Sequence, residues 1–313
     1  MFVRQNLSSG HFGRFAFAIV AVSGTLAVAP VALGPREAPA EAATAGPRTV
    51  IGITPWVLGG YWVVATDGSA APIGNANHSY YGGAVVPGSP SSGTFVPLRS
   101  PQPATVGIAA FGSTGLWVVA ADGGVLPVGA APFFGSMEGR SLNAPVVGMA
   151  TATEGYWLVA ADGGVFAFGQ AGFYGSVPGM LKPGQSLNQP IVGIAAPADG
   201  RGYWLVGADG GVFAFGDAQF YGSMGGMSLN KPIVGIAASQ GYGIYAPTGS
   251  WLVASDGGIF SFNAAFEGSL ANTALRAPIT GMAANFGGLG YWMVAADGGV
   301  FAFGDAPFWG SAG

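Results

Sequence analysis

Residues able to perform acid–base or nucleophilic chemistry are scarce in this chain of 313 residues, which has two His and no Cys. Beyond residue 42 the only His is His78. A Ser–His–acid triad would have to use it, and no Gly-x-Ser-x-Gly elbow occurs. A single His without Cys or a carboxylate cluster cannot complete a zinc site. We therefore expect His78 to be an exposed loop residue, and we expect neither a metal nor a cofactor.

Paired carboxylates would be the chemistry of a glycosidase, which needs two carboxyl groups about 5–10 Å apart in different environments. Six of the acids after residue 42 each stand before a Gly, where a role in a turn explains them. The other six are scattered through expected loops: Glu138, Glu154, Asp199, Asp217, Glu267 and Asp305. Asp217 and Asp305 share one repeat position, but nothing in the sequence forces a catalytic pair. No D-x-D-x-D-G ladder for calcium is present.

Recurring amides and aromatic residues favour binding over catalysis. The motif Ser-Leu-Asn-x-Pro recurs three times, and aromatic pairs such as Phe173-Tyr174 recur near it. Aromatic rings beside amides can stack on sugar rings and hydrogen-bond to them, so that weak sites are multiplied by the repeat. The simpler interpretation, which we favour, is that Asn-x-Pro shapes a turn and the pairs seal an edge. The candidate ligand-binding residues are Asn143, Asn188, Asn230, Tyr174, Tyr221 and Trp309.

The elements that would position these residues come from an internal repeat, best seen in residues 202–223 (GYWLVGADGGVFAFGDAQFYGS). A fixed period of this kind indicates a repeat architecture. An anchoring Trp recurs at Trp62, Trp117, Trp157, Trp204, Trp251 and Trp292. Five residues after each Trp stands a turn Asp: Asp67, Asp122, Asp162, Asp209, Asp256 and Asp297. The steps between successive Trp residues are 55, 40, 47, 47 and 41.

Each repeat contains four short apolar runs bounded by Gly, Asp or Pro, a pattern typical of β-strands. The Asp-Gly between the second and third runs predicts a type I′ hairpin turn, with positive φ at both central positions. Seven residues after each turn Asp stands Gly, or Asn263 in the fifth repeat, which predicts a left-handed backbone. A Gly inside each first run predicts a bulge or a close backbone approach.

The runs are apolar on both faces, so neighbouring sheets must cover them. We therefore predict an all-β fold: a single β-propeller of six four-stranded blades, with seven blades as the lesser alternative. The repeats should begin near residues 50, 105, 146, 191, 233 and 279. A β-helix is disfavoured, because its coils are shorter and need no tight hairpin. The six Trp side chains should anchor the layers between blades.

The N-terminal segment predicts export, and the composition fits a fold whose sheets are buried on both faces. Only 8% of residues are charged, against about a quarter in an ordinary globular domain. Residues 1–42 combine Arg4 and Arg14, an apolar stretch at Phe15–Ala29 and a small-x-small site at Ala40–Ala42, which predicts a signal peptide with a short helix. An uncleaved membrane anchor is the alternative. Residues 43–49 form a linker and residues 50–313 the propeller, with no further membrane span expected.

After residue 42 the chain carries 7 Lys and Arg against 12 Asp and Glu. This acidic balance gives nucleic-acid binding no electrostatic basis. The localisation that follows is secreted or associated with the cell envelope.

The unit PIVGIAA…GYWLVAADGGVFAFGDAPFYGS resembles a repeat of exported proteins in high-GC Gram-positive bacteria, where it often accompanies cell-wall hydrolase or esterase modules. The resemblance covers residues 50–313 and leaves no room for such a module. It assigns no activity to the repeat itself. More distantly, the order of strand, Asp-Gly turn, aromatic strand and aromatic-Gly is similar to the regulator of chromosome condensation repeat, a seven-bladed propeller. The shorter unit and six copies here depart from that family, and its nucleotide-exchange role carries over to no residue.

These observations favour an exported, non-catalytic binding or scaffold module at the cell envelope, with wall polysaccharide or a surface protein as partner. Two alternatives remain open. One is a secreted hydrolase of glycan or ester bonds that uses loop carboxylates or His78. The other is a purely structural surface protein.

Overall fold

The computed structural model describes residues 48–57, 59–74, 94–98, 103–239 and 249–312. The chain divides into two compact units, Met1–Thr44 and Ala45–Gly313, and all described residues belong to the second. The expected signal peptide with its helix, most of the linker, and His78 lie outside the described residues.

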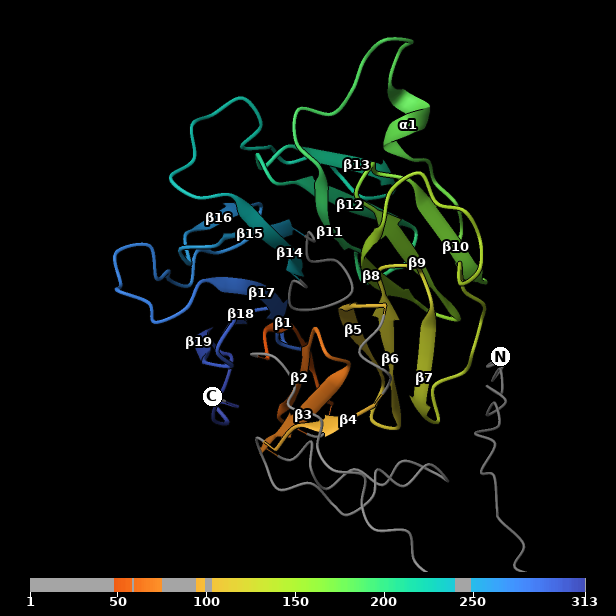
Figure 1. The fold of residues 1–313 in the computed structure, drawn as a ribbon. Helices are drawn as coiled ribbons and strands as arrows, with labels where there is room; N and C mark the ends of the chain where they lie inside the picture. The colour runs from red at the N-terminus through yellow and green to blue at the C-terminus, as the bar shows by residue number, and fades with distance from the viewer. Residues whose placement is uncertain (1–47, 58, 75–93, 99–102, 240–248, 313) are drawn as a thin grey trace, which may run out of the picture. The chain divides into compact units, whose positions relative to one another are not determined.

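The described residues form six antiparallel sheets, numbered here one to six along the chain (Figure 1). Sheet one contains β1 (Val50–Pro55), β2 (Tyr61–Ala65), β3 (Ser69–Ile73) and β4 (Val96–Pro97), and sheet two contains β5 (Thr105–Phe111), β6 (Gly115–Ala120) and β7 (Val125–Gly129). Sheet three contains β8 (Val146–Ala152), β9 (Gly155–Ala160) and β10 (Val165–Gly169), and sheet four contains β11 (Ile191–Ala195), β12 (Gly202–Gly207) and β13 (Val212–Gly216). Sheet five contains β14 (Ile233–Ser239), β15 (Gly249–Ala254) and β16 (Ile259–Phe262), and sheet six contains β17 (Ile279–Ala284), β18 (Gly290–Ala295) and β19 (Val300–Gly304). A single helical turn, α1 (Val177–Met180), follows sheet three.

The first strand of every sheet is an edge strand, and these strands contact one another in a closed cycle. β1 contacts β5, β5 contacts β8, and the series continues through β11, β14 and β17 back to β1. The backbone N–H of Val50 donates to the carbonyl of Ala296 at 3.0 Å, which joins sheet one to sheet six. The all-β, propeller-like fold expected from the repeat is therefore present.

The middle strands explain why both faces of each sheet are apolar. In β9 all six residues are buried. Tyr156 and Leu158 pack with residues of sheet two, whereas Trp157 and Val159 pack with residues of sheet four. Alternate side chains of one strand point to opposite faces, so each middle strand supplies the core on both sides of its sheet.

A Trp–Tyr pair joins neighbouring sheets. The rings of Trp157 in sheet three and Tyr203 in sheet four lie 5.3 Å apart, and the Tyr203 hydroxyl donates to the Gly175 carbonyl at 2.6 Å. The Trp157 indole N–H donates to the Gly172 carbonyl at 2.7 Å. The same ring pairing joins sheets two and three, five and six, and six and one. All six repeated Trp side chains are at most 3% exposed.

The Asp-Gly turns differ from the expected type I′ geometry. In sheet two the Gly123 N–H donates to Ala120 and the Ala120 N–H donates to Gly124, both at 2.9 Å, which leaves a three-residue loop. Gly123 has φ +77°, whereas Asp122 does not have positive φ. This is the pattern of a type I turn followed by a left-handed Gly. The Asp122 carboxylate accepts the Gly124 N–H at 2.9 Å, which stabilises the turn without a left-handed Asp.

The prediction of four regular strands in every sheet is wrong for sheets two to six. Their fourth runs, which we call the rim segments, are residues 132–137, 172–177, 219–224, 265–270 and 307–312, and none of them is a strand. Each makes one backbone–backbone hydrogen bond to the Gly of its sheet's Asp-Gly turn, of the kind that Met224 N–H makes to the Gly210 carbonyl at 2.9 Å. Carbonyls that a β-ladder would use accept bonds from Trp and Tyr side chains instead. A Gly with φ between +122° and +134° also interrupts each segment.

Two predictions about backbone geometry are confirmed. The position seven residues after each turn Asp is left-handed in all six repeats, including Asn263 at φ +49°, the one non-Gly residue with positive φ among those described. The Gly of the first strand marks a register shift in every sheet. This Gly also lies close to the first strand of the neighbouring sheet. A β-carbon added at Gly281 in β17, for example, would lie 3.6 Å from the Cα of Gly52 in β1.

Candidate functional site

The rim segments expose one Phe in each of sheets two to six. Its fractional exposure is nearly constant, between 58% and 61%. These residues are Phe133, Phe173, Phe220, Phe266 and Phe308. Each is the first residue of an aromatic pair, or of Phe-Glu in sheet five. Its side chain points to solvent and away from the core between the sheets. Isolated exposed apolar residues are common, but the same exposure at five equivalent positions is a property of the repeat.

Two of the predicted ligand-binding residues, Tyr174 and Trp309, are the second residue of their pair and have a packing role. Tyr174 lies over Gly216 of the next sheet, where an added β-carbon would come within 2.8 Å of its ring. Trp309 covers Gly74 in the same way, at 2.9 Å. Tyr174, Tyr221 and Trp309 remain 36%, 40% and 39% exposed, respectively. The preceding Phe is the more exposed member of each of these pairs, so the predicted Tyr and Trp residues are not the ones that point most fully to solvent.

The Ser-Leu-Asn-x-Pro loops place their Asn at the surface. Leu187 is partly buried against the core between sheets three and four, and the Pro190 carbonyl accepts the Ala208 N–H at 2.9 Å. Asn188 lies between them and is exposed, as are Asn143 and Asn230 in the equivalent loops. The Leu and Pro therefore hold the loop, and the amide is left to solvent.

The structure brings one predicted amide together with an exposed aromatic ring. A groove of 330 Å³ in sheet four is lined by Asn188, Phe220 and Asp209, together with Ser186, Gln189 and Phe213. The exposed loop before β11 forms one wall, and the outer strand β13 with its rim segment forms the other. Apolar rings thus lie beside two amides, a hydroxyl and a carboxylate. The aromatic member is Phe220 and not the predicted Tyr221.

Asp209 in this groove is half-buried and already serves the turn. One of its carboxylate oxygens accepts the Gly211 N–H at 2.9 Å. The equivalent Asp residues of the other five sheets accept the same bond. Within the described part of the chain, no group of three or more His, Cys, Asp or Glu lies close enough to hold a metal ion. Asp217 and Asp305 are both exposed, each just after the third strand of its sheet.

Among the described residues, four tyrosines and one aspartate have shifted pKa values. Burial raises the pKa of Tyr61 and of Tyr291 to about 12, against opposing hydrogen bonds from the rim segments. Burial likewise raises the pKa of Tyr156 and Tyr203. The pKa of Asp67 is lowered: partial burial acts to raise it, but hydrogen bonds from Ser69 and from Arg48 outweigh that effect. The Arg48 Nε lies 3.0 Å from the Asp67 carboxylate.

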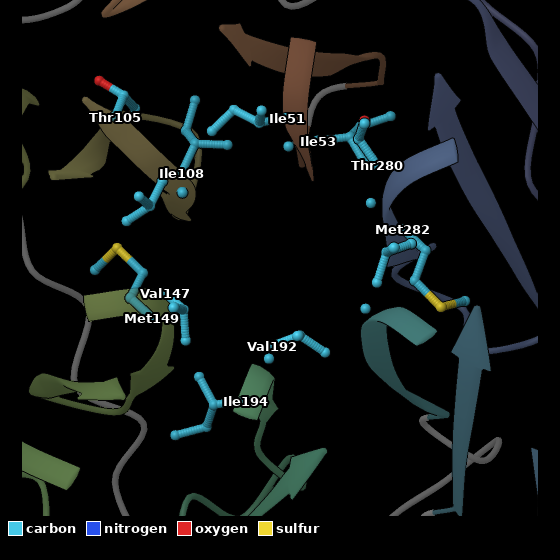
Figure 2. Close-up of a pocket in the computed structure, with 18 of the residues that line it drawn as sticks. Ile51, Ile53, Thr105, Ile108, Val147, Met149, Val192, Ile194, Thr280 and Met282 are labelled. Atoms are coloured by element: carbon cyan, nitrogen blue, oxygen red, sulfur yellow. The ribbon is translucent and has the colours of Figure 1, made fainter. Parts of the chain in front are cut away.

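A second hollow lies between the first strands of all six sheets. This central cavity has a volume of 470 Å³ (Figure 2). Its lining begins near Thr66 and Thr105, at the end of the sheets that carries the Asp-Gly turns. One ring of side chains, with one member from each first strand, surrounds it there: Ile51, Val106, Val147, Val192, Val234 and Thr280.

A second ring of apolar side chains lies deeper in the central cavity. It consists of Ile53, Ile108, Met149, Ile194, Ile236 and Met282. These residues also line another cavity, of 320 Å³, which extends to Asn285 and Phe286 at the opposite end. The two hollows therefore meet at this ring. Among the described residues that line the 470 Å³ cavity, none carries a charged side chain.

Comparison with known proteins supports the fold alone. No protein-family model and no curated protein sequence matches the chain. A catalytically inactive variant of virginiamycin B lyase from Staphylococcus aureus, solved with quinupristin, is similar in structure with a TM-score of 0.51 and 11% identity, over 84% of this chain and 97% of that one. BBS1N in complex with ARL6DN gives a TM-score of 0.46 and 14% identity, over 82% and 77% of the two chains. The similarity to the lyase is that of one β-propeller-like fold to another.

Helices long and apolar enough to cross a bilayer are absent from the residues that the structure describes.

Proposed function

We propose that this protein is an exported, non-catalytic, six-bladed β-propeller of the repeat type described above, which acts as a binding module for cell-envelope glycan. The observation that carries the proposal is the groove in sheet four, where Phe220 and Phe213 lie beside the side chains of Asn188, Gln189 and Asp209. Binding sites generally combine an apolar lining with a few polar groups that fix orientation. A sugar ring offers a matching apolar face and a rim of hydroxyls.

The six-bladed count rests on the closed cycle of first strands, which contains one member from each of the six sheets. Export rests on the sequence of residues 1–42. Both points can be checked directly: an experimental structure gives the blade number, and N-terminal sequencing of protein recovered from the medium gives the cleavage site. Cleavage after Ala42 is expected. Retention of residues 1–42 in a membrane fraction would favour the anchor.

The glycan proposal is tested with insoluble cell-wall sacculi and a glycan array as probes. We expect the wild-type chain to sediment with sacculi, and we expect Phe220→Ala to reduce this binding at least fivefold. Phe308→Ala is the matched control, because Phe308 has 61% exposure against 60% for Phe220 and lies outside the groove. Its binding should be unchanged.

Two results would contradict this function. One is that the wild type binds neither sacculi nor any arrayed glycan, or that Phe220→Ala binds as well as the wild type. The other is turnover in a panel of glycosidase and esterase substrates that is lost on Asp217→Ala or Asp305→Ala, which would identify a hydrolase.

A further inference from the structure

We propose that the 470 Å³ central cavity binds one unbranched aliphatic chain with an uncharged head group, entering from the end that carries the Asp-Gly turns. The cavity is distinct from the groove in sheet four, since the two share no lining residue. It therefore constitutes a second site, independent of the proposed glycan function.

The chemistry of the lining selects an apolar ligand. Five of the six side chains in the outer ring are aliphatic: Ile51, Val106, Val147, Val192 and Val234. The sixth is the side chain of Thr280. Its hydroxyl donates a shared hydrogen bond to the carbonyl oxygens of Val50 and Val294, which lie 2.9 and 3.2 Å from the hydroxyl oxygen. That hydroxyl is already engaged in the protein. A lining of aliphatic side chains favours an apolar guest over a hydrated one.

The shape of the cavity selects a narrow guest. Figure 2 shows the labelled side chains arranged around one central opening, and each first strand presents a similar side chain to it. The deeper ring repeats this arrangement, and five of its six members (all but Met149) are at most 9% exposed. A lining that repeats around an axis offers no flat slot for a planar ring. It suits a rod-shaped molecule that lies along the axis.

The distance from the entrance to the deeper ring, where the second hollow begins, gives the length of chain that the 470 Å³ cavity would hold. β5 and the residue before it contribute lining residues from Ala104 to Ile108, which at about 3.3 Å per residue span roughly 13 Å. An extended hydrocarbon with C–C bonds of about 1.5 Å covers that distance with on the order of ten carbons. The volume lies within the range of about 300–1,000 Å³ usual for small-molecule sites.

The absence of charge in the lining decides the head group. An unpaired carboxylate carried into apolar surroundings would lose its hydration without compensation. Among the described residues, no Lys or Arg lines the cavity to replace that hydration. A neutral alcohol or ester is therefore expected to bind more tightly than the corresponding carboxylate.

The test is titration calorimetry of the full chain with 1-decanol, with decanoate and phenol as comparison probes. We expect 1-decanol to bind with one site per chain and a negative heat-capacity change. Decanoate should bind at least tenfold more weakly and phenol more weakly still. Failure of 1-decanol to bind, or tighter binding of decanoate or phenol, would overturn the proposal.

Variants of the outer ring show where the probe binds. Val147→Phe with Val192→Phe fills the opening and should abolish binding of 1-decanol. Val147→Thr with Val192→Thr keeps nearly the same side-chain volume, guards against a folding defect in the first variant, and should weaken binding at least tenfold. Equal binding by the threonine variant would refute the site. Phe220→Ala should leave 1-decanol binding unchanged, and the ring variants should leave binding to sacculi unchanged, so the two proposals fail separately.

Discussion

The hydroxyl of Tyr61 donates a hydrogen bond to the backbone carbonyl of Gly310, 249 residues later in the chain. The Tyr61 ring packs against Trp292 with 5.4 Å between ring centroids. The same contacts join sheets three and four through Tyr203, Gly175 and Trp157. The junction between the first and last sheets therefore uses the same interactions as a junction inside the repeat array.

Removing one of these hydroxyls should weaken the protein measurably. Tyr203→Phe keeps the ring but leaves the Gly175 carbonyl without its 2.6 Å donor. We expect the free energy of unfolding in urea to fall by about 1–2 kcal/mol. Tyr61→Phe should cost a similar amount, because the junctions are equivalent. Tyr221→Phe, at 40% exposure, is the control and should change stability by less than about 0.5 kcal/mol. A Tyr203→Phe protein as stable as the control would show that the bond contributes nothing.

Stability should fall in alkaline solution because of the same tyrosines. Their hydroxyls ionise near pH 10 in the unfolded chain, whereas the pKa values of Tyr61 and Tyr291 are about 12 in the folded protein. Between these values the unfolded state binds fewer protons than the folded state, so the free energy of unfolding decreases as pH rises. The stabilisation is complete below pH 10 and is lost as pH approaches 12.

Urea unfolding measured from pH 8 to pH 11.5 checks this dependence. The double variant Tyr61→Phe, Tyr291→Phe should show a shallower decline above pH 10 than the wild type. Parallel declines would mean that other groups cause the alkaline loss.

The anchoring Trp residues should be costly to truncate. Trp204 is 2% exposed, and its indole N–H donates to the Gln219 carbonyl at 2.8 Å. Trp204→Ala should lower the free energy of unfolding by roughly 3–5 kcal/mol through the cavity it leaves. Trp309→Ala, at 39% exposure, should cost clearly less. An unchanged midpoint of thermal unfolding for Trp204→Ala would refute its place in the core.

Replacement of Gly155 should be costly, because backbone atoms of the same sheet lie close to its Cα. A β-carbon there would overlap the carbonyl oxygen of Phe168 and lie 2.9 Å from the Ala171 nitrogen. Since both are backbone atoms, the clash cannot be relieved by a change of rotamer, and Gly155→Ala should cost about 3 kcal/mol. Gly179 in α1 has only the Ser176 hydroxyl nearby, at 3.7 Å. Gly179→Ala should therefore be neutral or slightly stabilising in the same unfolding assay.

Much of the fold could be predicted because residue types that recur at equivalent positions of the repeat indicate the backbone conformation and the burial at those positions. Gly at five equivalent positions and Asn263 at the sixth is a pattern that only a left-handed conformation explains, and φ is positive at all six. Apolar residues on both faces of the middle strands required covering sheets, which the structure provides. These features depend on each residue's own conformation or on its hydrophobicity.

The features that the sequence did not predict depend on contacts that form only in the folded protein. The type I′ hairpin predicted from Asp-Gly is wrong because Asp-Gly suits two turn geometries, and the third loop residue decides between them. The aromatic composition of the rim segments predicts strands, but a Gly with positive φ interrupts the extended backbone in each of them. The Tyr hydroxyl bonds between sheets could have been suspected from Tyr before Trp in four repeats, at Tyr61, Tyr156, Tyr203 and Tyr291. The groove in sheet four could not be predicted from the sequence, because only the path of the loop brings Asn188 and Phe220 together.

The junction at Tyr61 has a consequence for engineering. Among the described strands, those of every sheet are consecutive in sequence, so none of these sheets contains a strand from a distant part of the chain. New chain termini could therefore be placed in an exposed connection between sheets, such as the loop around Asn188, with the original termini joined by a linker. Such a change would not divide a sheet. Circular permutants of this protein should keep all six sheets whole, which makes it a suitable frame for displaying inserted peptides at a chosen point on the circumference.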